Sequence, residues 1–110
     1  MRGSLRAAVF MAAGICVSAA VGGVVDTPEC RRDLLMADAL IRGVRLRETS
    51  VQSGDIAGLC RLLRQNLKDM NQAREPMARC MVGHERGENV GQMDVSLDDI
   101  RFVLAKHCGG

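Results

Sequence analysis

Residues 56–84 read IAGLCRLLRQNLKDMNQAREPMARCMVGH, and this stretch decides the fold. Its apolar side chains recur every three or four residues, at Ile56, Leu59, Cys60, Leu63, Leu67 and Met70. That spacing is typical of an amphipathic helix with one buried face. Ser53 or Asp55 is placed to cap its start. Pro76 lacks an amide proton and crowds the preceding turn, so we expect a break at 73–75 and a new helix that begins with Pro76.

The segment before this stretch predicts another helix, over residues 30–47. Thr27 is a good N-cap, Pro28 suits the first turn, and Glu29 carries the negative charge favoured at a helix N-terminus. A broad apolar face follows, with arginines and aspartates on the other faces. A polar turn at 48–54 then leads into the central stretch.

The segment after the central stretch predicts a loop and then a last helix. Residues 83–94 hold three glycines and many polar side chains, and we expect them to be irregular. Ser96 is placed to cap the last helix, with Asp99 at the third helical position, while Lys106 and His107 suit its C-terminal end. The sequence therefore predicts an all-α fold, a small bundle of about four helices with no credible strand.

The start of the chain has the order of a secretory signal peptide. Two arginines, an apolar run at 7–17 and small residues at 18–20 follow one another. We expect residues 1–20 to be removed after Ala20, with Gly22 as the alternative last residue removed. The apolar run is shorter than the roughly 20 residues of a membrane span, although an uncleaved anchor is the alternative.

What remains, residues 21–110, is predicted to be a single small helical domain with no membrane span. A periplasmic or secreted location follows from the signal peptide. Phe102 is then the only aromatic residue, so the core must consist of Leu, Ile, Val, Met and Ala. Removing two arginines from the 15 basic residues leaves as many as the 13 acidic ones. A neutral exported chain without aromatics is a poor candidate for binding nucleic acid.

Four cysteines lie outside the predicted signal peptide, and in an oxidising compartment they predict two disulfides. Cys60 and Cys80 would lie about 30 Å apart along nearly one helical axis, so they do not pair with each other. Antiparallel helices favour Cys30–Cys80 with Cys60–Cys108; the main alternative is Cys30–Cys60 with Cys80–Cys108. The spacings match neither a Cys-x-x-Cys redox motif nor the close ligand pairs of zinc modules.

Met77, Met81 and His84 are the candidate metal ligands. If the helix continues, they fall on one helical face, where thioethers and an imidazole could hold Cu(I). Cys80 drops out as a ligand if it is oxidised. The plain alternative is that the methionines pack a core that lacks aromatics, and we favour it and expect no cofactor.

His84, Arg86 and Glu88 are the candidate contacts for a protein partner, because they lie in the polar, glycine-rich segment. The segment lacks the second histidine of a His-Glu-x-x-His zinc motif. A solvated loop is the plain alternative. No nucleophile–base–acid set is evident in the sequence, so we do not expect an enzyme.

The sequence therefore favours an exported, non-catalytic helical protein that acts as a protein-interaction or envelope accessory module with an unknown protein partner. Two alternatives stay open. One is a periplasmic metal-binding or metal-sensing protein that uses the methionine–histidine face. The other is a toxin-neutralising or stress-protective periplasmic protein.

Overall fold

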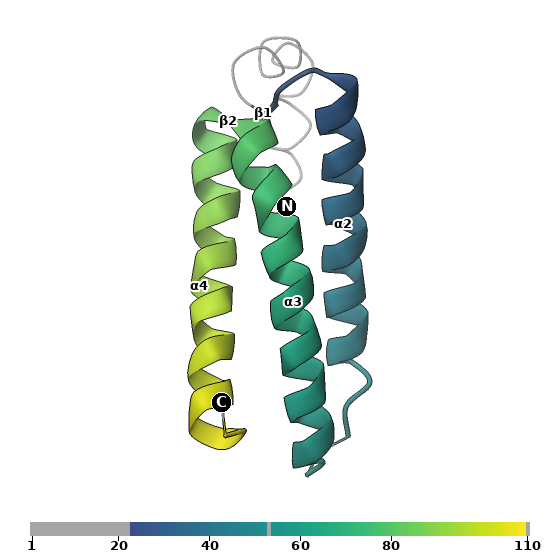
Figure 1. Ribbon diagram of the computed structural model, residues 1–110, viewed down its shortest axis with the longest axis vertical. Coiled ribbons are helices and arrows are strands. Elements are labelled where there is room, and N and C mark those ends of the chain that lie inside the picture. Colours follow the sequence, from purple (N-terminus) through teal and green to yellow (C-terminus); the bar gives the residue numbers. More distant parts are fainter. Residues whose placement is uncertain (1–22, 53, 110) are drawn as a thin grey trace, which may run out of the picture.

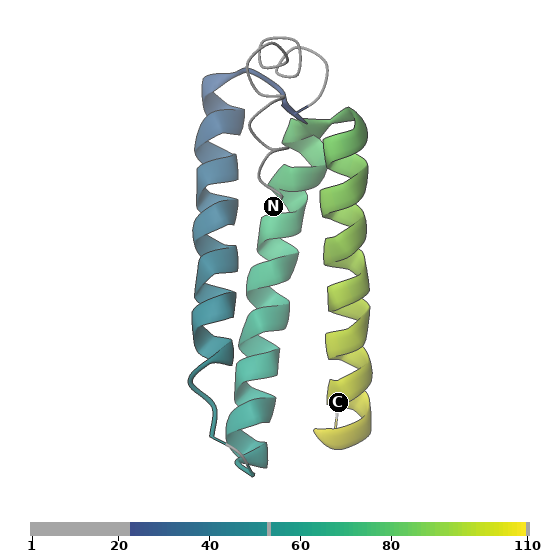
Figure 2. The same ribbon diagram turned by 180° about the vertical axis from the view of Figure 1, so that it is seen from behind.

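The fold is an all-α bundle of three long helices. The computed structural model describes residues 23–52 and 54–109, so the predicted signal peptide and its cleavage site lie outside the described residues. Helices α2 (Pro28–Glu48), α3 (Ile56–Cys80) and α4 (Gly83–His107) lie side by side and antiparallel, with α3 in the middle (Figures 1 and 2). Within the described residues, no helix is both long and apolar enough to cross a lipid bilayer.

The expected break before Pro76 is wrong, and this is one reason why the bundle has three helices instead of four. Helix α3 runs through Pro76 and ends at Cys80. A proline inside a helix costs about 3 kcal/mol, through a lost hydrogen bond and a steric clash. Here Pro76 is buried, and its neighbours Ala73 and Met77 belong to the core. Burial of this last turn offsets the local penalty.

The expected loop over residues 83–94 is also wrong, because α4 begins at Gly83 and Ser96 lies inside it. Gly87 and Gly91 each cost about 1 kcal/mol relative to alanine in a helix. Apolar side chains nevertheless keep a helical spacing through the glycines, and four of them are buried: Val90, Met93, Leu97 and Leu104. Tertiary packing of an amphipathic face supplies most of a helix's stability in a protein, and here it outweighs the glycines.

The caps of α2 and α3 come from the sequence as expected. The Cys30 N–H donates to the Thr27 hydroxyl at 3.1 Å. The Gly58 N–H donates to the Asp55 carboxylate at 2.8 Å. Each cap satisfies a backbone donor that the first turn of a helix leaves unpaired.

A short strand pair closes one end of the bundle, against the expectation of no strand. Strand β1 (Gly23–Val24) pairs antiparallel with β2 (Met81–Val82), which connects α3 to α4 (Figure 1). Gly83 follows with a φ of +64°, a left-handed conformation that glycine adopts freely. The Val25 N–H also donates to the Cys80 carbonyl at 2.7 Å. Residues 23–25 are therefore tied to the corner between α3 and α4.

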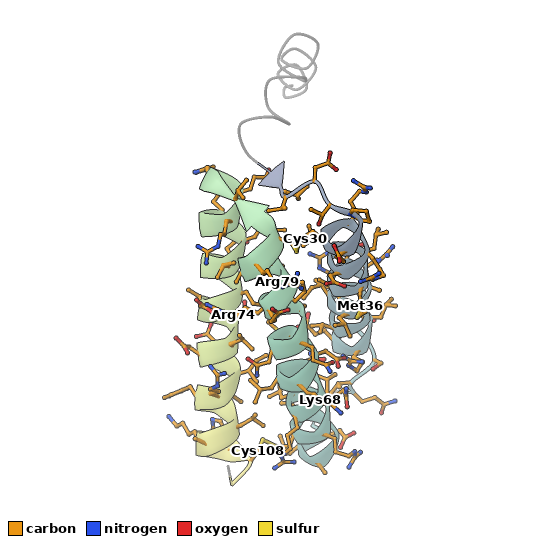
Figure 3. All side chains as sticks on the ribbon, turned by 45° about the horizontal axis from the view of Figure 1, so that its top comes forward. Cys30, Met36, Lys68, Arg74, Arg79 and Cys108 are labelled. Carbon is orange, nitrogen blue, oxygen red and sulfur yellow. A yellow bond between two sulfur atoms is a disulfide. The ribbon has the colours of Figure 1, made fainter. Side chains whose placement is uncertain are left out.

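Two disulfides join the helices at opposite ends of the bundle. Cys30–Cys80 links the start of α2 to the end of α3, and Cys60–Cys108 links the start of α3 to the end of α4. Figure 3 shows Cys30 and Cys108 at these two ends. These are the pairs that antiparallel helices favoured from sequence. Each outer helix is thus held to α3 by one covalent link.

The core follows the middle helix. It is built from alanine, valine, methionine and leucine, namely Ala37, Val44, Met70, Ala73, Met77, Val90, Met93 and Leu97. Phe102 contributes little, since its side chain is exposed. Helix α3 packs against both α2 and α4, whereas the two outer helices barely touch each other. This open arrangement leaves part of the core accessible between α2 and α4.

Candidate functional site

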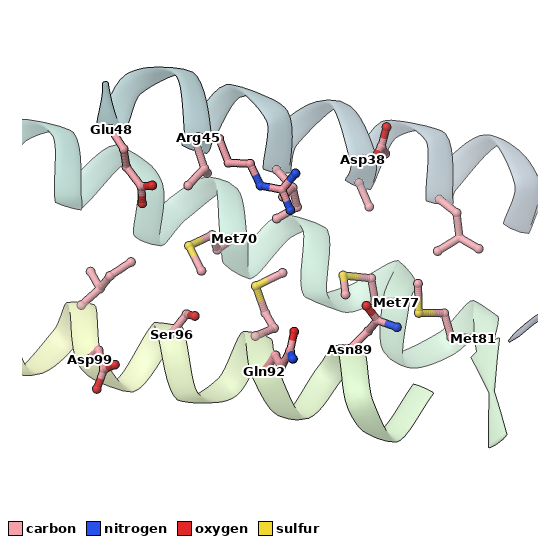
Figure 4. Close-up of a pocket in the computed structure, with 16 residues that line it drawn as sticks. Asp38, Arg45, Glu48, Met70, Met77, Met81, Asn89, Gln92, Ser96 and Asp99 are labelled. Carbon is pink, nitrogen blue, oxygen red and sulfur yellow. The ribbon is translucent and has the colours of Figure 1, made fainter. Parts of the chain in front are cut away.

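The candidate site is a groove of about 570 Å³ between α2 and α4, with α3 as its floor (Figure 4). Apolar side chains from all three helices line its depth, including Leu34, Ile41 and Val44 from α2, Met70 and Met77 from α3, and Met93 and Ile100 from α4. The two outer helices form its walls because neither closes over the middle one. Cavities of roughly 300–1,000 Å³ are the usual size of binding sites.

Methionine is the most frequent residue type among those that line the groove. Four of the seven methionines in the chain line it, namely Met70, Met77, Met81 and Met93. In Figure 4, Met70, Met77 and Met81 point into the space between the outer helices. Methionine side chains are unbranched and polarizable, so they adapt their shape to different apolar partners. The groove therefore offers an adaptable apolar surface.

Polar side chains form the two edges of the groove. Helix α2 contributes Asp38, Arg45 and Glu48, and α4 contributes Asn89, Gln92, Ser96 and Asp99 (Figure 4). The two edges together thus carry three carboxylates and one guanidinium. Asp38 pairs with Arg42 one turn away, at 3.0 Å. Among the described residues, Glu48, Asp99 and Arg45 form no salt bridge, so with Asp38 paired to Arg42 the edges carry two unpaired carboxylates and one unpaired guanidinium.

The predicted metal ligands are not brought together on one helical face. Helix α3 ends at Cys80 and Met81 is extended, so the helical spacing that would align Met77, Met81 and His84 is interrupted. Met77 and Met81 line the groove, but the His84 side chain is 85% exposed and lies 3.6 Å from the Glu88 carboxylate. Within the described residues, no three His, Cys, Asp or Glu side chains cluster as metal ligands.

The predicted partner contacts His84, Arg86 and Glu88 lie on the first turns of α4 instead of in a loop. All three are exposed. The Arg86 Nε donates to the Ala78 carbonyl at 2.7 Å. That carbonyl belongs to the last turn of α3, where backbone acceptors have no partner within the helix. Arg86 therefore stabilises the corner between α3 and α4.

The α4 side of the groove is not among the predicted site residues. The sequence predicts a loop for Asn89 and Gln92 and a cap for Ser96, whereas all three lie within α4 and line the groove. One pattern could have identified them: the buried residues Val90 and Met93 continue the spacing of Leu97 toward the N-terminus. The glycines at nearby positions obscured it, because they lower the helix propensity of the segment.

A charged cluster covers the Cys30–Cys80 disulfide on the outside of α2 and α3. The Arg79 guanidinium donates to Asp33 at 2.8 Å and to Glu75 at 3.0 Å, and it lies 3.3 Å from the Cys80 sulfur. The hydrogen bonds from Arg79 lower the pKa of the Asp33 carboxyl and the pKa of the Glu75 carboxyl, because they stabilise the ionised forms. These contacts hold α2 against α3 beside the covalent link.

A second polar cluster is buried between α2 and α3. Arg47 donates to Asn66 at 2.9 Å and to Asp69, and Gln65 also donates to Asp69, at 3.0 Å. Asn66 is fully buried, and its amide nitrogen has no partner among the described residues. A buried polar group that loses its partner costs about 1–3 kcal/mol. Because the partners in this cluster come from different helices, a shift of α2 along α3 would break the hydrogen bonds of Arg47 and is disfavoured. The cluster fixes the α2 wall of the groove relative to its floor.

Comparison of the chain with protein-family models, with curated proteins and with solved structures finds no match in any of the three.

Proposed function

We propose that this protein is an exported, non-catalytic interaction module that holds a segment of a protein in the groove between α2 and α4. The observation that carries the proposal is the accessible apolar core between two helices that do not close over the third. Accessible apolar surface edged by polar residues is typical of protein-interaction sites. The disulfides hold α2 and α4 to α3, which favours a groove that exists before the partner arrives.

The proposed site of action is the periplasm or the exterior of the cell. Two disulfides are compatible with an oxidising environment and would be reduced in most cytosols. Residues 1–20 carry the signal-peptide pattern that would deliver the chain there. Toxin neutralisation and stress protection are two forms that such an interaction module can take.

Site-specific photo-cross-linking in the producing cell tests this proposal. A photoreactive amino acid replaces Gln92, which is exposed and lines the groove, or Ala105, which is exposed on the opposite side of α4. We expect cross-linked protein from position 92 and little from position 105. Ser96→Trp fills the groove from an exposed position and should abolish the product from position 92. Equal products from the two positions, or no effect of Ser96→Trp, would exclude the groove.

The four methionines in the groove also favour a second candidate, the binding of a soft metal ion such as Cu(I). Met77→Leu separates the two functions. Leucine keeps the apolar volume but lacks the thioether, so it preserves protein docking and weakens metal binding. Titration of Cu(I) into the oxidised protein, against a competing chelator, is the measurement. Absence of binding at micromolar metal would end this candidate.

A further inference from the structure

The two disulfides differ in their access to solvent. Cys80 is fully buried and Cys30 is 6% exposed. The Arg79 guanidinium lies 3.3 Å from the Cys80 sulfur and 3.8 Å from the Cys30 sulfur, so it covers this link on one side. At the other end of the bundle Cys60 is 7% exposed, but Cys108, which follows the last turn of α4, is only partly buried. A thiolate from solvent therefore reaches the Cys60–Cys108 link more easily than the Cys30–Cys80 link.

Unpaired positive charge lies beside the more accessible link. Arg64 follows Cys60 by one helical turn, and its guanidinium donates to the Cys108 carbonyl at 2.9 Å. Arg61 directly follows Cys60 and is exposed as well. Within residues 23–52 and 54–109, neither arginine forms a salt bridge. Two cations without carboxylate partners therefore lie within about one turn of Cys60.

The arginines beside the covered link are all paired with carboxylates. Arg79 donates to Asp33 at 2.8 Å and to Glu75 at 3.0 Å. In the first turns of α2, Arg31 and Arg32 also pair with acidic side chains. Three carboxylates thus balance three arginines at this end of the bundle. Paired charges of opposite sign largely cancel at a distance, so the covered link attracts an approaching anion less.

Cations beside a disulfide favour its exchange with thiols in two ways. The attacking group is a thiolate, and a positive field draws it in. One protein sulfur departs as a thiolate, which a nearby cation or a helix N-terminus stabilises. Cys60 has both kinds of stabilisation, because it lies near the start of α3 and has Arg61 and Arg64 beside it.

We propose that the Cys60–Cys108 disulfide is a site of thiol–disulfide exchange with thiols that carry negative charge. The reagent thiolate attacks the Cys108 sulfur and forms a mixed disulfide, and the electron pair of the broken sulfur–sulfur bond leaves on Cys60. A second reagent thiolate attacks the reagent sulfur of the mixed disulfide and releases Cys108. Two electrons and two protons thus pass from two reagent thiols to the two cysteines, and the reagent becomes its own disulfide.

Exchange at this link frees one end of one groove wall. The Cys30–Cys80 disulfide remains and holds the start of α2 to the end of α3. The end of α4, which belongs to the other wall, loses its covalent tie to the start of α3. The exchange site lies at the end of the bundle, so it does not depend on what the groove holds.

Timed treatment of the exported protein without residues 1–20 with glutathione tests the proposal. Free thiols are alkylated at intervals, and peptide mapping by mass spectrometry assigns each label or glutathione adduct to its cysteine. We expect Cys60 and Cys108 to be the first to react, about tenfold faster than the other two cysteines. Equal initial rates for the two pairs, or an earlier reaction of the other pair, would overturn the proposal.

Arg61→Gln/Arg64→Gln separates the effect of charge from that of access. Glutathione is anionic and 2-mercaptoethanol is neutral, so the ratio of their exchange rates measures the attraction by the arginines. We expect the double variant to lower this ratio about threefold or more, and added salt to lower it in the parent protein. Circular dichroism checks that the variant keeps its helices.

Arg31→Gln/Arg32→Gln is the matched control. It removes two arginines that are paired with carboxylates and lie beside the covered link, so the ratio of exchange rates should stay as in the parent protein. An unchanged ratio in Arg61→Gln/Arg64→Gln, or an equal fall in the control, would show that the unpaired arginines do not select the thiol and would contradict the proposal.

Discussion

Arg47 is the side chain that supplies hydrogen-bond donors to two buried polar groups. It neutralises the Asp69 carboxylate and donates to the Asn66 amide oxygen. Its guanidinium reaches from α2 to Asn66 and Asp69 on α3, both of them buried. Exposed ion pairs elsewhere on the surface contribute little, since water competes for both partners. At this scale, stability depends on whether a buried group keeps its partner.

Replacing Arg47 by leucine should therefore lower the free energy of unfolding by about 2–3 kcal/mol, because Asp69 loses its charged donor and Asn66 its hydrogen bond. Urea denaturation measures the loss. Arg45→Leu is the matched control, since Arg45 lies two residues away on the exposed edge of the groove, and it should change stability by less than about 0.5 kcal/mol. Equal losses of unfolding free energy in the two variants would show that the contacts of Arg47 with the buried cluster contribute no more to stability than an exposed arginine does.

Acid should weaken the fold slightly, because protonation removes the small contribution of the half-exposed carboxyls that pair with arginines. A hydrogen bond from Arg74 lowers the pKa of the Asp94 carboxyl, just as Arg79 lowers the pKa of Asp33. The folded-state pKa lies below the unfolded value of about 4, so this stabilisation is complete above pH 4 or so and is lost as the pH falls through the folded-state pKa. The fall in melting temperature between pH 6 and pH 2 should be smaller for Asp94→Asn than for the parent protein, because the variant has no Asp94 carboxylate to protonate. Asp99→Asn, on the same helix but without an ion pair among the described residues, should follow the parent curve.

At the scale of single elements, α4 shows packing overriding local propensity. Gly87 and Gly91 lie inside a continuous helix, exposed, and a Cβ atom added to either would meet nothing within 4 Å. Their conformations are ordinary helical ones, unlike that of Gly83, whose φ is +64°. The helix therefore carries two weak positions that its buried face compensates.

Gly87→Ala and Gly91→Ala should each stabilise the protein by about 0.5–1 kcal/mol, because alanine has a lower entropy cost in a helix and no clash arises. Gly83→Ala is the contrasting variant and should destabilise, since an alanine there must adopt a left-handed conformation. Thermal melts of the three variants measure the differences. If α4 began near residue 96, as the sequence predicted, Gly87→Ala and Gly91→Ala would have little effect.

At the scale of the whole molecule, two covalent links compensate for a small core without aromatics. Each disulfide closes a loop of about 50 residues, since the sequence separations are 50 and 48. In the chain-entropy account, a loop of that length is worth about 4 kcal/mol. Total stability of a small domain is about 5–15 kcal/mol, so either link is a large share of it.

Cys60→Ser/Cys108→Ser should therefore lower the free energy of unfolding by about 4 kcal/mol and release the end of α4 from α3. Hydrogen exchange of backbone amides should accelerate most in the last turns of α4, the helix that forms one wall of the groove. The exported protein without residues 1–20, which lacks Cys16, is alkylated before and after reduction and then weighed; it should take no label before reduction and four after it. Free thiols before reduction would contradict the two links.

The local features of the helices were predictable from sequence because they depend on neighbouring residues. Thr27 and Asp55 cap helices through contacts three residues away. The apolar spacing over 56–70 located only part of the buried face of α3, because Ile56 is exposed while the buried set also includes Leu62, Asn66 and Asp69. The distance between Cys60 and Cys80 along nearly one helical axis excluded their pairing, and the antiparallel arrangement of the helices favoured Cys30–Cys80 with Cys60–Cys108 over the alternative. The continuity of α3 through Pro76 did not follow, because the penalty is local and its compensation comes from other helices.

The sequence by itself determined that the chain is helical, where its first two helices begin, and which residues can face a core, since these depend on propensity, capping and periodicity. Only the tertiary structure decided that there are three helices instead of four, and that the outer two leave the methionines of the middle one accessible. The physical reason is that helix continuity through Pro76 and the glycines, and the open groove, depend on packing energies between segments far apart in the chain. Those energies exceed the local preferences that a sequence pattern reports.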